Sequence, residues 1–416
     1  MQRMLYAEFC LPEMLTMKTL LMVLVQALRQ HRWLCLFGCA YIFSSVGNGL
    51  TQTIILGQLL RWHASPATLT LTYMLATLPG FFGSLLGERL CRHVSPLRLL
   101  LLSELAGLAG LLLPLYGLLA HSIPALLALQ SIEAFVAGLS WPAMSLVFKR
   151  GLSTAELPAA TSMETVIFAA QVLLGTGIGV LLFGRMSPLV LLGIDATSFV
   201  LAIALLGITS RYLRLPPGDA EEMRHKVSWS RLSTLQQRSL LMLPALAAVG
   251  APAMALLPAL IQQIQPDTAA GLALPLIFAR SLGQLCGPLL LKANRLEQYA
   301  ASNRYLLCCL LAFLAAYCLL PGLSAWTAAA LVMIFLAHLA SNVVFALGTF
   351  SLLHTFPEES VSAASAKAWR WQAMSAALAT LTAAFLSEKW GAAQALYSVS
   401  FMALVLVMAV LIRYRR

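Results

Sequence analysis

The chain has 416 residues, of which 60% are apolar and only 10% are charged. Soluble domains carry roughly a quarter charged residues, so this balance excludes an assembly of soluble domains and predicts an all-α protein that crosses a membrane many times. The net charge of +11 would suit a protein that binds nucleic acid, but the positions of the basic residues, described below, exclude that class.

The first 32 residues precede the first long apolar run. Met17-Lys18-Thr19-Leu20-Leu21 opens a short apolar stretch that is similar to a signal peptide. This stretch ends at Arg29-Gln30-His31-Arg32 and continues into the next apolar run without a small-residue cleavage site. We predict that 1–32 is a cytosolic, amphipathic lead-in, and a cleaved signal peptide is the alternative.

Twelve apolar runs approach or exceed the length of about 20 residues that a membrane-spanning helix needs. They are 34–60, 66–87, 97–119, 123–147, 161–184, 188–209, 240–264, 270–291, 305–320, 326–350, 364–386 and 392–412. The one clear shift in composition is a basic, polar segment after the sixth run. The sequence therefore predicts two six-helix bundles, 33–210 and 239–412, joined by a cytosolic linker, 211–238, and followed by a short cytosolic tail, 413–416.

The basic residues fix the orientation of these spans. If the N-terminus is cytosolic, 23 of the 27 Lys and Arg residues fall in cytosolic segments, three fall in outer segments, and Arg280 lies inside a span. Cytosolic loops of membrane proteins carry such an excess of Lys and Arg. We therefore predict that both termini are cytosolic. The net basicity follows from membrane topology, and the sequence predicts no nucleic-acid partner.

The loop between the second and third runs carries a cluster of charge. Its sequence is Gly83-Ser84-Leu85-Leu86-Gly87-Glu88-Arg89-Leu90-Cys91-Arg92-His93. An acid beside basic residues at a cytosolic helix end can hold two bundles together through charge-assisted hydrogen bonds. Gly83, Glu88, Arg89 and Arg92 are therefore candidates for a cytosolic latch, and an ordinary basic cytosolic loop is the alternative.

The fifth run contains a row of small residues, Gly175-Thr176-Gly177-Ile178-Gly179-Val180. Small residues at this spacing allow two helices to approach closely. Gly175 and Gly179 are therefore candidates for a helix-packing motif.

Two six-span halves, a basic linker and these motifs together resemble the major facilitator superfamily of transporters. The 83–93 loop is similar to its conserved cytosolic loop, and 175–180 is similar to a degraded form of its exporter motif. Three further stretches, Glu133–Gly138, Asp195–Phe199 and Ala279–Pro288, resemble its siderophore- and macrolide-exporting branch. The resemblance implies twelve transmembrane helices in two pseudo-symmetric halves that move about a site at the membrane midplane.

Four polar residues lie near the centres of predicted spans: Asn48, Glu133, Arg280 and His338. Ionisable groups at mid-membrane cost at least about 2.5–3.5 kcal/mol, so they normally face a cavity or a partner. The resemblance implies that the helices carrying these four residues can reach the substrate path. Asn48, Arg280 and His338 are candidates for substrate binding, and Glu133 and His338 for proton coupling.

Each of these assignments has an alternative. Burial disfavours the charged form of a carboxyl group, which would let Glu133 bind and release a proton, but a permanent ion pair with Arg280 is equally open. Arg280 would otherwise dock an anionic or phenolate-bearing substrate. A lone interior histidine such as His338 is more often only hydrogen-bonded.

Other polar and aromatic residues are expected to have structural roles. Glu104 and Asp195 fall on the third and sixth runs, which typically face outward in the superfamily, and we expect them to pair with neighbouring groups. Trp369 and Trp371 lie near the cytosolic end of the eleventh run and Trp326 near the outer end of the tenth. All three are expected to anchor the chain at the membrane interface.

The sequence lacks a phosphate-binding Gly-x-x-x-x-Gly-Lys loop, hydrolase motifs and paired cysteines. We therefore expect no enzyme, no cofactor and no metal site. The resemblance implies a monomeric secondary transporter in a bacterial inner membrane, whose task is proton-coupled export of a siderophore or similar amphipathic metabolite. Multidrug or macrolide efflux, uptake of a small anionic or iron-bound solute, and a non-transporting receptor or assembly factor are the alternatives.

Overall fold

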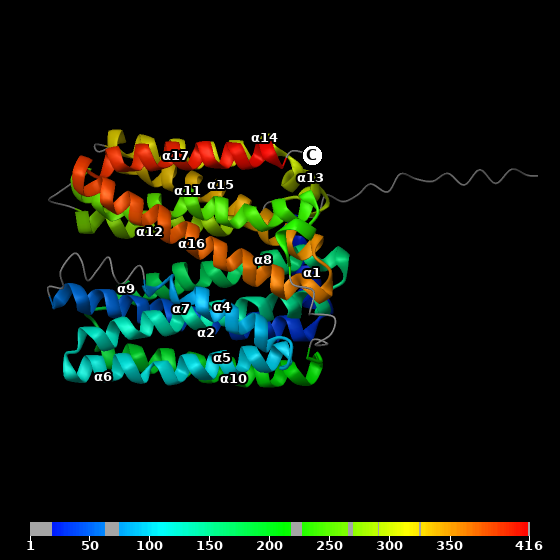
Figure 1. Cartoon of the computed structure of the whole chain (residues 1–416). Helices are drawn as coiled ribbons and strands as arrows, with labels where there is room; N and C mark the ends of the chain where they lie inside the picture. Colours follow the sequence, from blue (N-terminus) through cyan, green and yellow to red (C-terminus); the bar gives the residue numbers. More distant parts are fainter. Residues whose placement is uncertain are drawn as a thin grey trace, which may run out of the picture.

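The computed structural model describes residues 19–62, 75–217, 227–264, 269–289, 291–323 and 326–414. Within these ranges the chain is helical apart from two isolated β-bridges, and nine of the helices are long and apolar enough to cross a membrane. Figure 1 shows the long helices side by side, with the blue-to-green first half next to the yellow-green-to-red second half. The prediction of an all-α, multi-pass membrane protein is confirmed.

Each predicted span of the first half corresponds to helix in the structure. The helices are α2 (Arg32–Arg61), α4 (Pro79–Leu90), α5 (Pro96–Gly110) with α6 (Leu112–Ala120), α7 (Ile123–Gly151), α8 (Leu157–Ala169) with α9 (Gly177–Leu182), and α10 (Pro188–Tyr212). A π-helical segment, η2 (Ala170–Thr176), joins α8 to α9. The start of the predicted second span, up to residue 74, lies outside the described residues.

The second half repeats this arrangement. Its long helices are α11 (Thr234–Ile264), α12 (Ala269–Leu289), α14 (Asn303–Leu319), α15 (Thr327–Thr355), α16 (Glu358–Trp390) and α17 (Ala392–Arg413). Helix α16 begins at Glu358, before the predicted span 364–386, and it is not among the nine strongly apolar helices. Its first turns are polar because they pack against the other half of the protein, so hydropathy alone underestimates its length.

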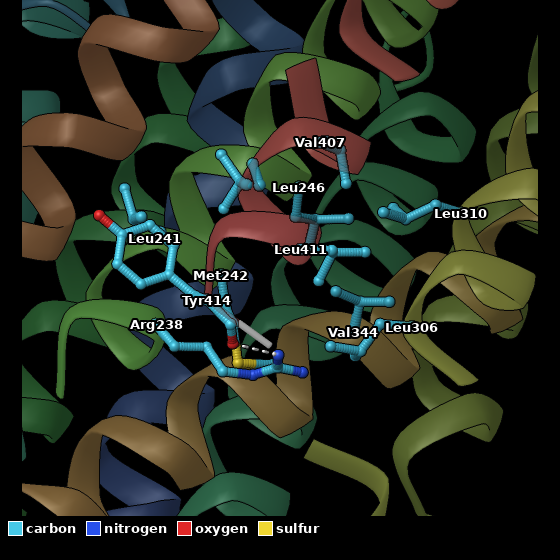
Figure 2. A pocket seen from close by; sticks show the side chains of 12 residues that line it. Arg238, Leu241, Met242, Leu246, Leu306, Leu310, Val344, Val407, Leu411 and Tyr414 are labelled. Carbon is cyan, nitrogen blue, oxygen red and sulfur yellow. Dashed lines mark hydrogen bonds between the residues drawn. The ribbon is translucent and has the colours of Figure 1, made fainter. Parts of the chain in front are cut away.

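The predicted linker, 211–238, is shorter in the structure. Helix α10 continues to Tyr212 and α11 begins at Thr234, while 218–226 lie outside the described residues. Arg238, placed in the linker by the sequence, is only 3% exposed. It donates to the carbonyl oxygen of Ala300 (2.8 Å) and to that of Tyr414 (3.2 Å), the contact drawn in Figure 2. Arg238 therefore ties the start of α11 to α13 (Leu296–Ala301) and to the end of α17.

The described part of the predicted lead-in is a short amphipathic helix, α1 (Leu20–Gln30), capped by the Thr19 hydroxyl. Its buried side chains, Leu20, Leu24 and Ala27, follow the spacing of one helical face. Helix α1 packs against α8 and α2, and the Leu20 amide donates to the Leu291 carbonyl (2.7 Å) after α12. The lead-in thus contacts both halves.

Glycines bring α4 and α7 into backbone contact. A Cβ atom at Gly83 would overlap the Phe135 carbonyl oxygen, and one at Gly87 would overlap the Leu139 carbonyl oxygen. Only a residue without a side chain permits this approach. Gly83, predicted as part of the latch, therefore positions the helix on which the latch charges lie.

The second half contains the same contact, 200 residues later in both helices. Gly283 and Gly287 of α12 lie against the carbonyl oxygens of Phe335 and Leu339 of α15. The two halves are therefore built on one packing pattern, with α4 and α7 in the first half and α12 and α15 in the second.

Glycines also set the contact between α2 and the π-helical segment. A Cβ atom at Gly175 would lie 2.6 Å from the Val46 carbonyl oxygen and 2.8 Å from the Cα atom of Gly49. At Gly179 it would lie 2.7 Å from the Thr53 hydroxyl oxygen. Gly175 and Gly179 thus lie where two helices touch.

The two buried acids expected to be structural both contact α2. Glu104 accepts a hydrogen bond from the Ser44 hydroxyl (2.7 Å). Asp195 is fully buried and accepts from the hydroxyl groups of Thr51 and Ser198. Buried polar groups are normally satisfied in this way, so these acids hold α5 and α10 against α2.

The halves meet along a few helices. Helix α16 of the second half packs against α4 and α7 of the first, and α8 of the first half packs against α12 and α15 of the second. Figure 1 shows α16 (orange) running obliquely between the two groups of helices. We call the end of the bundle that holds α1 and the end of α17 the basic end.

Candidate functional site

A cavity of about 390 Å³ lies between the two halves. Helices α2, α7 and α8 with η2 line it from the first half, together with residues before α4, and α16 lines it from the second. The lining residues are Asn48, Gln52, Ala76, Thr77, Gln130, Glu133, Ala134, Ala137, Phe168, Gln171, Trp369, Gln372, Ala373 and Ala376. The volume falls within the range of about 300–1,000 Å³ that small-molecule sites occupy.

Helical periodicity explains how these side chains reach one space. On α7, Gln130, Glu133 and Ala137 follow at intervals of three and four residues, and residues at that spacing share a helix face. On α16, Trp369, Gln372 and Ala376 repeat the same spacing. One face of each half thus supplies the cavity wall, and small alanines beside the polar groups leave the space open.

Four buried polar atoms in the cavity lining have no hydrogen-bond partner in the described structure. They are Asn48 Oδ1, Glu133 Oε1, Gln372 Oε1 and Trp369 Nε1. An unmet buried polar atom costs about 1–3 kcal/mol. The four residues that carry these atoms all line the same cavity.

Glu133 and Asn48, predicted separately from the sequence, therefore share one cavity. The Gln52 side chain lies within hydrogen-bonding reach of the Glu133 carboxyl group. Among the described residues no ion pair joins Glu133 to Arg280. The structure does not contain the permanent ion pair that the sequence left open.

Arg280 and His338 lie elsewhere. Neither residue lines the cavity. His338 is 1% exposed, its Nε2 atom lies 2.8 Å from the Tyr317 hydroxyl, and its ring packs edge-on against Phe313. These contacts fix His338 between α14 and α15 inside the second bundle, where it has the surroundings of a core histidine.

The candidate latch residues contribute differently at the basic end. Glu88 accepts hydrogen bonds from Arg370 of α16 (2.9 Å) and from Arg92 (3.5 Å). Arg89 is exposed and forms no ion pair within the described part of the chain. The candidate latch therefore contributes one charge pair between the halves, Glu88 with Arg370, and the motif alone did not suggest Arg370.

A second set of contacts lies at the same end. Arg150 at the end of α7 pairs with Glu358 at the start of α16 (2.5 Å). Lys149 donates to the Leu353 carbonyl oxygen of α15 (2.5 Å). In the described ranges both ion pairs that join the halves lie at the basic end.

Trp369 was predicted to anchor the chain at the membrane interface, and this prediction is wrong. Its indole lines the cavity and packs against Trp141 of α7, with ring centroids 4.8 Å apart and the ring planes tilted by 35°. Gly80 makes room for the indole, because a Cβ atom there would lie 3.0 Å from Trp369 Nε1. Trp371, two residues on, packs against Trp229 (5.3 Å) of the interhelical segment.

Sequence reasoning also missed the amides of the cavity, Gln52, Gln130, Gln171 and Gln372. A signal was present for two of them, because Gln52 follows Asn48 by four residues on α2 and Gln130 precedes Glu133 by three residues on α7. Glu164 was missed as well. It is 5% exposed on α8, next to Thr349 of α15, with one carboxyl oxygen lacking a partner.

Other cavities have different linings. A larger groove of about 500 Å³ on α5, α6 and α10 is lined only by Leu, Ala and Gly, which suits lipid chains. The cavity beside Arg238 (Figure 2) measures about 30 Å³ and is lined mainly by apolar side chains, so it holds little more than one water-sized sphere. Among the described residues no group of His, Cys, Asp and Glu could hold a metal ion.

No family model matches this chain. A curated protein of Pseudescherichia vulneris, described as an uncharacterized 29.9 kDa protein in the crtE 3′ region, is 89% identical over 74 residues. Those residues are 18% of this chain and 27% of that protein. The chain therefore spans about a quarter of the length of this relative.

Several solved structures share the arrangement of nearly the whole chain. A bacterial homologue of the iron transporter ferroportin, in an outward-facing state, is 16% identical with a TM-score of 0.66, covering 91% of this chain and 98% of its own. The human organic anion transporter MFSD10 is 14% identical with a TM-score of 0.61, covering 91% and 98%.

The Escherichia coli fucose:proton symporter FucP gives a similar match. It is 13% identical with a TM-score of 0.60, covering 92% of this chain and 98% of its own. A second structure of FucP, in the outward conformation, is described as a major facilitator superfamily transporter and has a TM-score of 0.62. Two repeated six-helix halves, a cavity between them and these matches agree: this chain is a multi-pass membrane protein with the fold of the major facilitator superfamily.

Proposed function

We propose that this chain is a secondary active transporter and not an enzyme. It moves a small solute across the bacterial cytoplasmic membrane by opening the central cavity to each side in turn. One observation carries the proposal: a cavity between two repeated halves is lined by a half-buried carboxyl group and four unpartnered polar atoms, and ion pairs join the halves at one end. This is the arrangement that alternating access requires.

Glu133 is the proposed proton carrier. It is the one acid among the described residues that line the cavity, and one of its oxygens has no partner. A carboxyl group in such a place changes its interactions with the solute when it gains or loses a proton. Binding of a proton and of the solute therefore become linked, which couples the solute to the proton gradient.

The basic end is proposed to face the cytosol, because cytosolic segments carry an excess of Lys and Arg. The export of a siderophore rests on short sequence similarities, whereas the cavity of about 390 Å³ favours a smaller polar solute. The similarity in fold to the fucose:proton symporter supports a small polar solute, and we propose uptake as the second direction to test.

The transport proposal is tested in proteoliposomes under an imposed pH gradient, with labelled neutral, cationic and anionic solutes. Cysteines at Arg150 and Glu358, in a cysteine-free background, can be joined by a short bis-maleimide at the basic end. We expect the joined protein to lose transport and the same variant without the linker to keep it. Transport that is equal in both, or absent from every sample including the unmodified chain, contradicts alternating access.

The pair of Glu88 and Arg370 is proposed to stabilise the state closed at the basic end. Both side chains are mostly buried, 19% and 14% exposed, and a hydrogen bond between charged groups contributes about 1.5–3 kcal/mol. We expect Arg370→Ala to shift the equilibrium toward the open state about 10-fold, measured as faster labelling of a cysteine in the cavity from the basic side.

Arg89→Ala is the matched control for this prediction. Arg89 is a neighbour in the same motif, but it is exposed and unpaired with Glu88 in the described structure. It should leave the labelling rate unchanged. Equal rates in both variants would show that Glu88 and Arg370 do not hold the halves together.

A further inference from the structure

The cavity lining specifies the chemical class of its ligand. Five of the lining residues, all from the described part of the chain, are amides: Asn48, Gln52, Gln130, Gln171 and Gln372. Each amide offers both a donor and an acceptor. None of the described lining residues is basic, and Glu133 is the single acid among them. A wall of this composition binds groups that donate and accept hydrogen bonds at once.

The four unpartnered polar atoms restrict the chemical class of the ligand further. Three of the four, on Asn48, Glu133 and Gln372, are oxygens, which require donors, and the fourth, Trp369 Nε1, requires an acceptor. An anion supplies only acceptors and would lie beside the Glu133 carboxyl group. A cation supplies donors but leaves the Trp369 N–H group unmet. A hydroxyl group supplies both.

Aromatic side chains add an apolar wall. Trp369 and Phe168 line the cavity from opposite halves, and Trp141 supports the Trp369 indole from behind, with ring centroids 4.8 Å apart. A flat, apolar surface beside amides suits a molecule whose hydroxyl groups point outward around a ring or chain of C–H groups.

We propose that the cavity binds a neutral, polyhydroxylated solute of the sugar or polyol class. The inference rests on the proposed transport function and specifies which class of solute the site binds. Gln372 and Trp369 are the specificity-determining residues from the second half, and Asn48 and Glu133 those from the first. Because the two pairs lie on different halves, a solute that bridges them favours the closed cavity.

The test is binding to the purified full-length chain in nanodiscs, measured by calorimetry and by the shift in melting temperature. The probes are D-xylose, L-fucose, D-glucose, xylitol and myo-inositol, compared with tetraethylammonium, spermidine, citrate and benzoate. We expect at least one neutral probe to bind saturably and more tightly than every charged probe. Tighter binding of a charged probe, or no binding of any neutral probe to the folded protein, overturns the proposal.

Three variants test where the solute binds. Gln372→Leu should weaken the best neutral probe about 10-fold, because it removes a hydrogen-bonding group from the cavity. Gln298→Leu, at an exposed position outside the cavity, should leave binding unchanged. Trp369→Phe keeps an aromatic ring but removes the N–H group, so it tests the same assignment if Gln372→Leu fails to fold.

The outcomes separate this inference from the proposed function. A charged solute that binds and accumulates in proteoliposomes overturns the ligand class and leaves transport standing. A neutral probe that binds at Gln372 but never crosses the membrane supports the ligand class and overturns transport.

Discussion

Glu133→Gln is expected to abolish gradient-driven accumulation while leaving exchange of solute across the membrane. Each pH unit of gradient corresponds to about 1.4 kcal/mol per proton, so one proton per solute across about two pH units supports about 100-fold accumulation. Gln keeps the size of Glu133 and still forms hydrogen bonds, but its side chain cannot bind and release a proton in this pH range. The measurement is the steady-state ratio of labelled solute inside and outside proteoliposomes, which should fall to about one.

Glu104→Gln is the matched control. Glu104 is also a buried acid in the first half, but it accepts a hydrogen bond from Ser44 and does not line the cavity. Its variant should accumulate solute as the unmodified chain does. If Glu133→Gln still accumulates solute, or if both variants lose accumulation equally, Glu133 is not the coupling group.

Gly83→Ala is expected to destabilise the fold by about 1–3 kcal/mol or more, the cost of overpacking a close contact. The added Cβ atom would overlap the Phe135 carbonyl oxygen, and a backbone atom cannot rotate away as a side chain can. Helix α4 must therefore move off α7, which also displaces Glu88 at its end. The readouts are a lower melting temperature and a lower yield of monodisperse protein.

Two further alanine variants check the cause. Gly283→Ala places the same clash against the Phe335 carbonyl oxygen in the second half and should be equally damaging. At Gly193 of α10 nothing lies within 4 Å of an added Cβ atom, so Gly193→Ala should be tolerated. If Gly83→Ala, Gly283→Ala and Gly193→Ala had similar melting temperatures, close backbone contact would not be the reason why glycine is needed at positions 83 and 283.

Much of the fold could be predicted from the sequence because lipid imposes a simple rule. A helix that faces lipid must be apolar along its length, so runs such as 188–209 and 392–412 correspond closely to α10 and α17. The rule weakens where a helix faces protein or a cavity. Helix α16 is longer than predicted because its polar first turns pack against α4 and α7.

The site was partly predictable for the same reason. Glu133 and Asn48 stand out because polar side chains are costly inside apolar spans, and both line the cavity. The same reasoning selected Arg280 and His338, which do not line the cavity. In the second half they lie at the positions that correspond to Gly80 and Gly138, 200 residues earlier. Because the sequence does not show how α12, α14 and α15 pack inside one bundle, it could not distinguish a core histidine from a site residue.

Partners across the two halves were the least predictable feature. Trp369 resembles an interface anchor in sequence, and only the approach of α16 to Gly80 places its indole in the cavity. The role of Arg370 likewise depends on its hydrogen bond to Glu88, which is 282 residues away in the chain. Such pairs depend on how two folded bundles meet, and neither periodicity nor hydropathy contains that information.

The proposed motion of the halves about the central cavity is measured most directly as a distance at the basic end. Spin labels at the exposed positions Arg89 of α4 and Glu359 of α16, in a cysteine-free background, report whether the bundles separate there. We predict two distance populations, with the longer one enriched by Arg370→Ala and its share changed by Glu133→Gln and by a bound solute. A single distance, unchanged by either substitution and by every solute tested, would contradict alternating access in this protein.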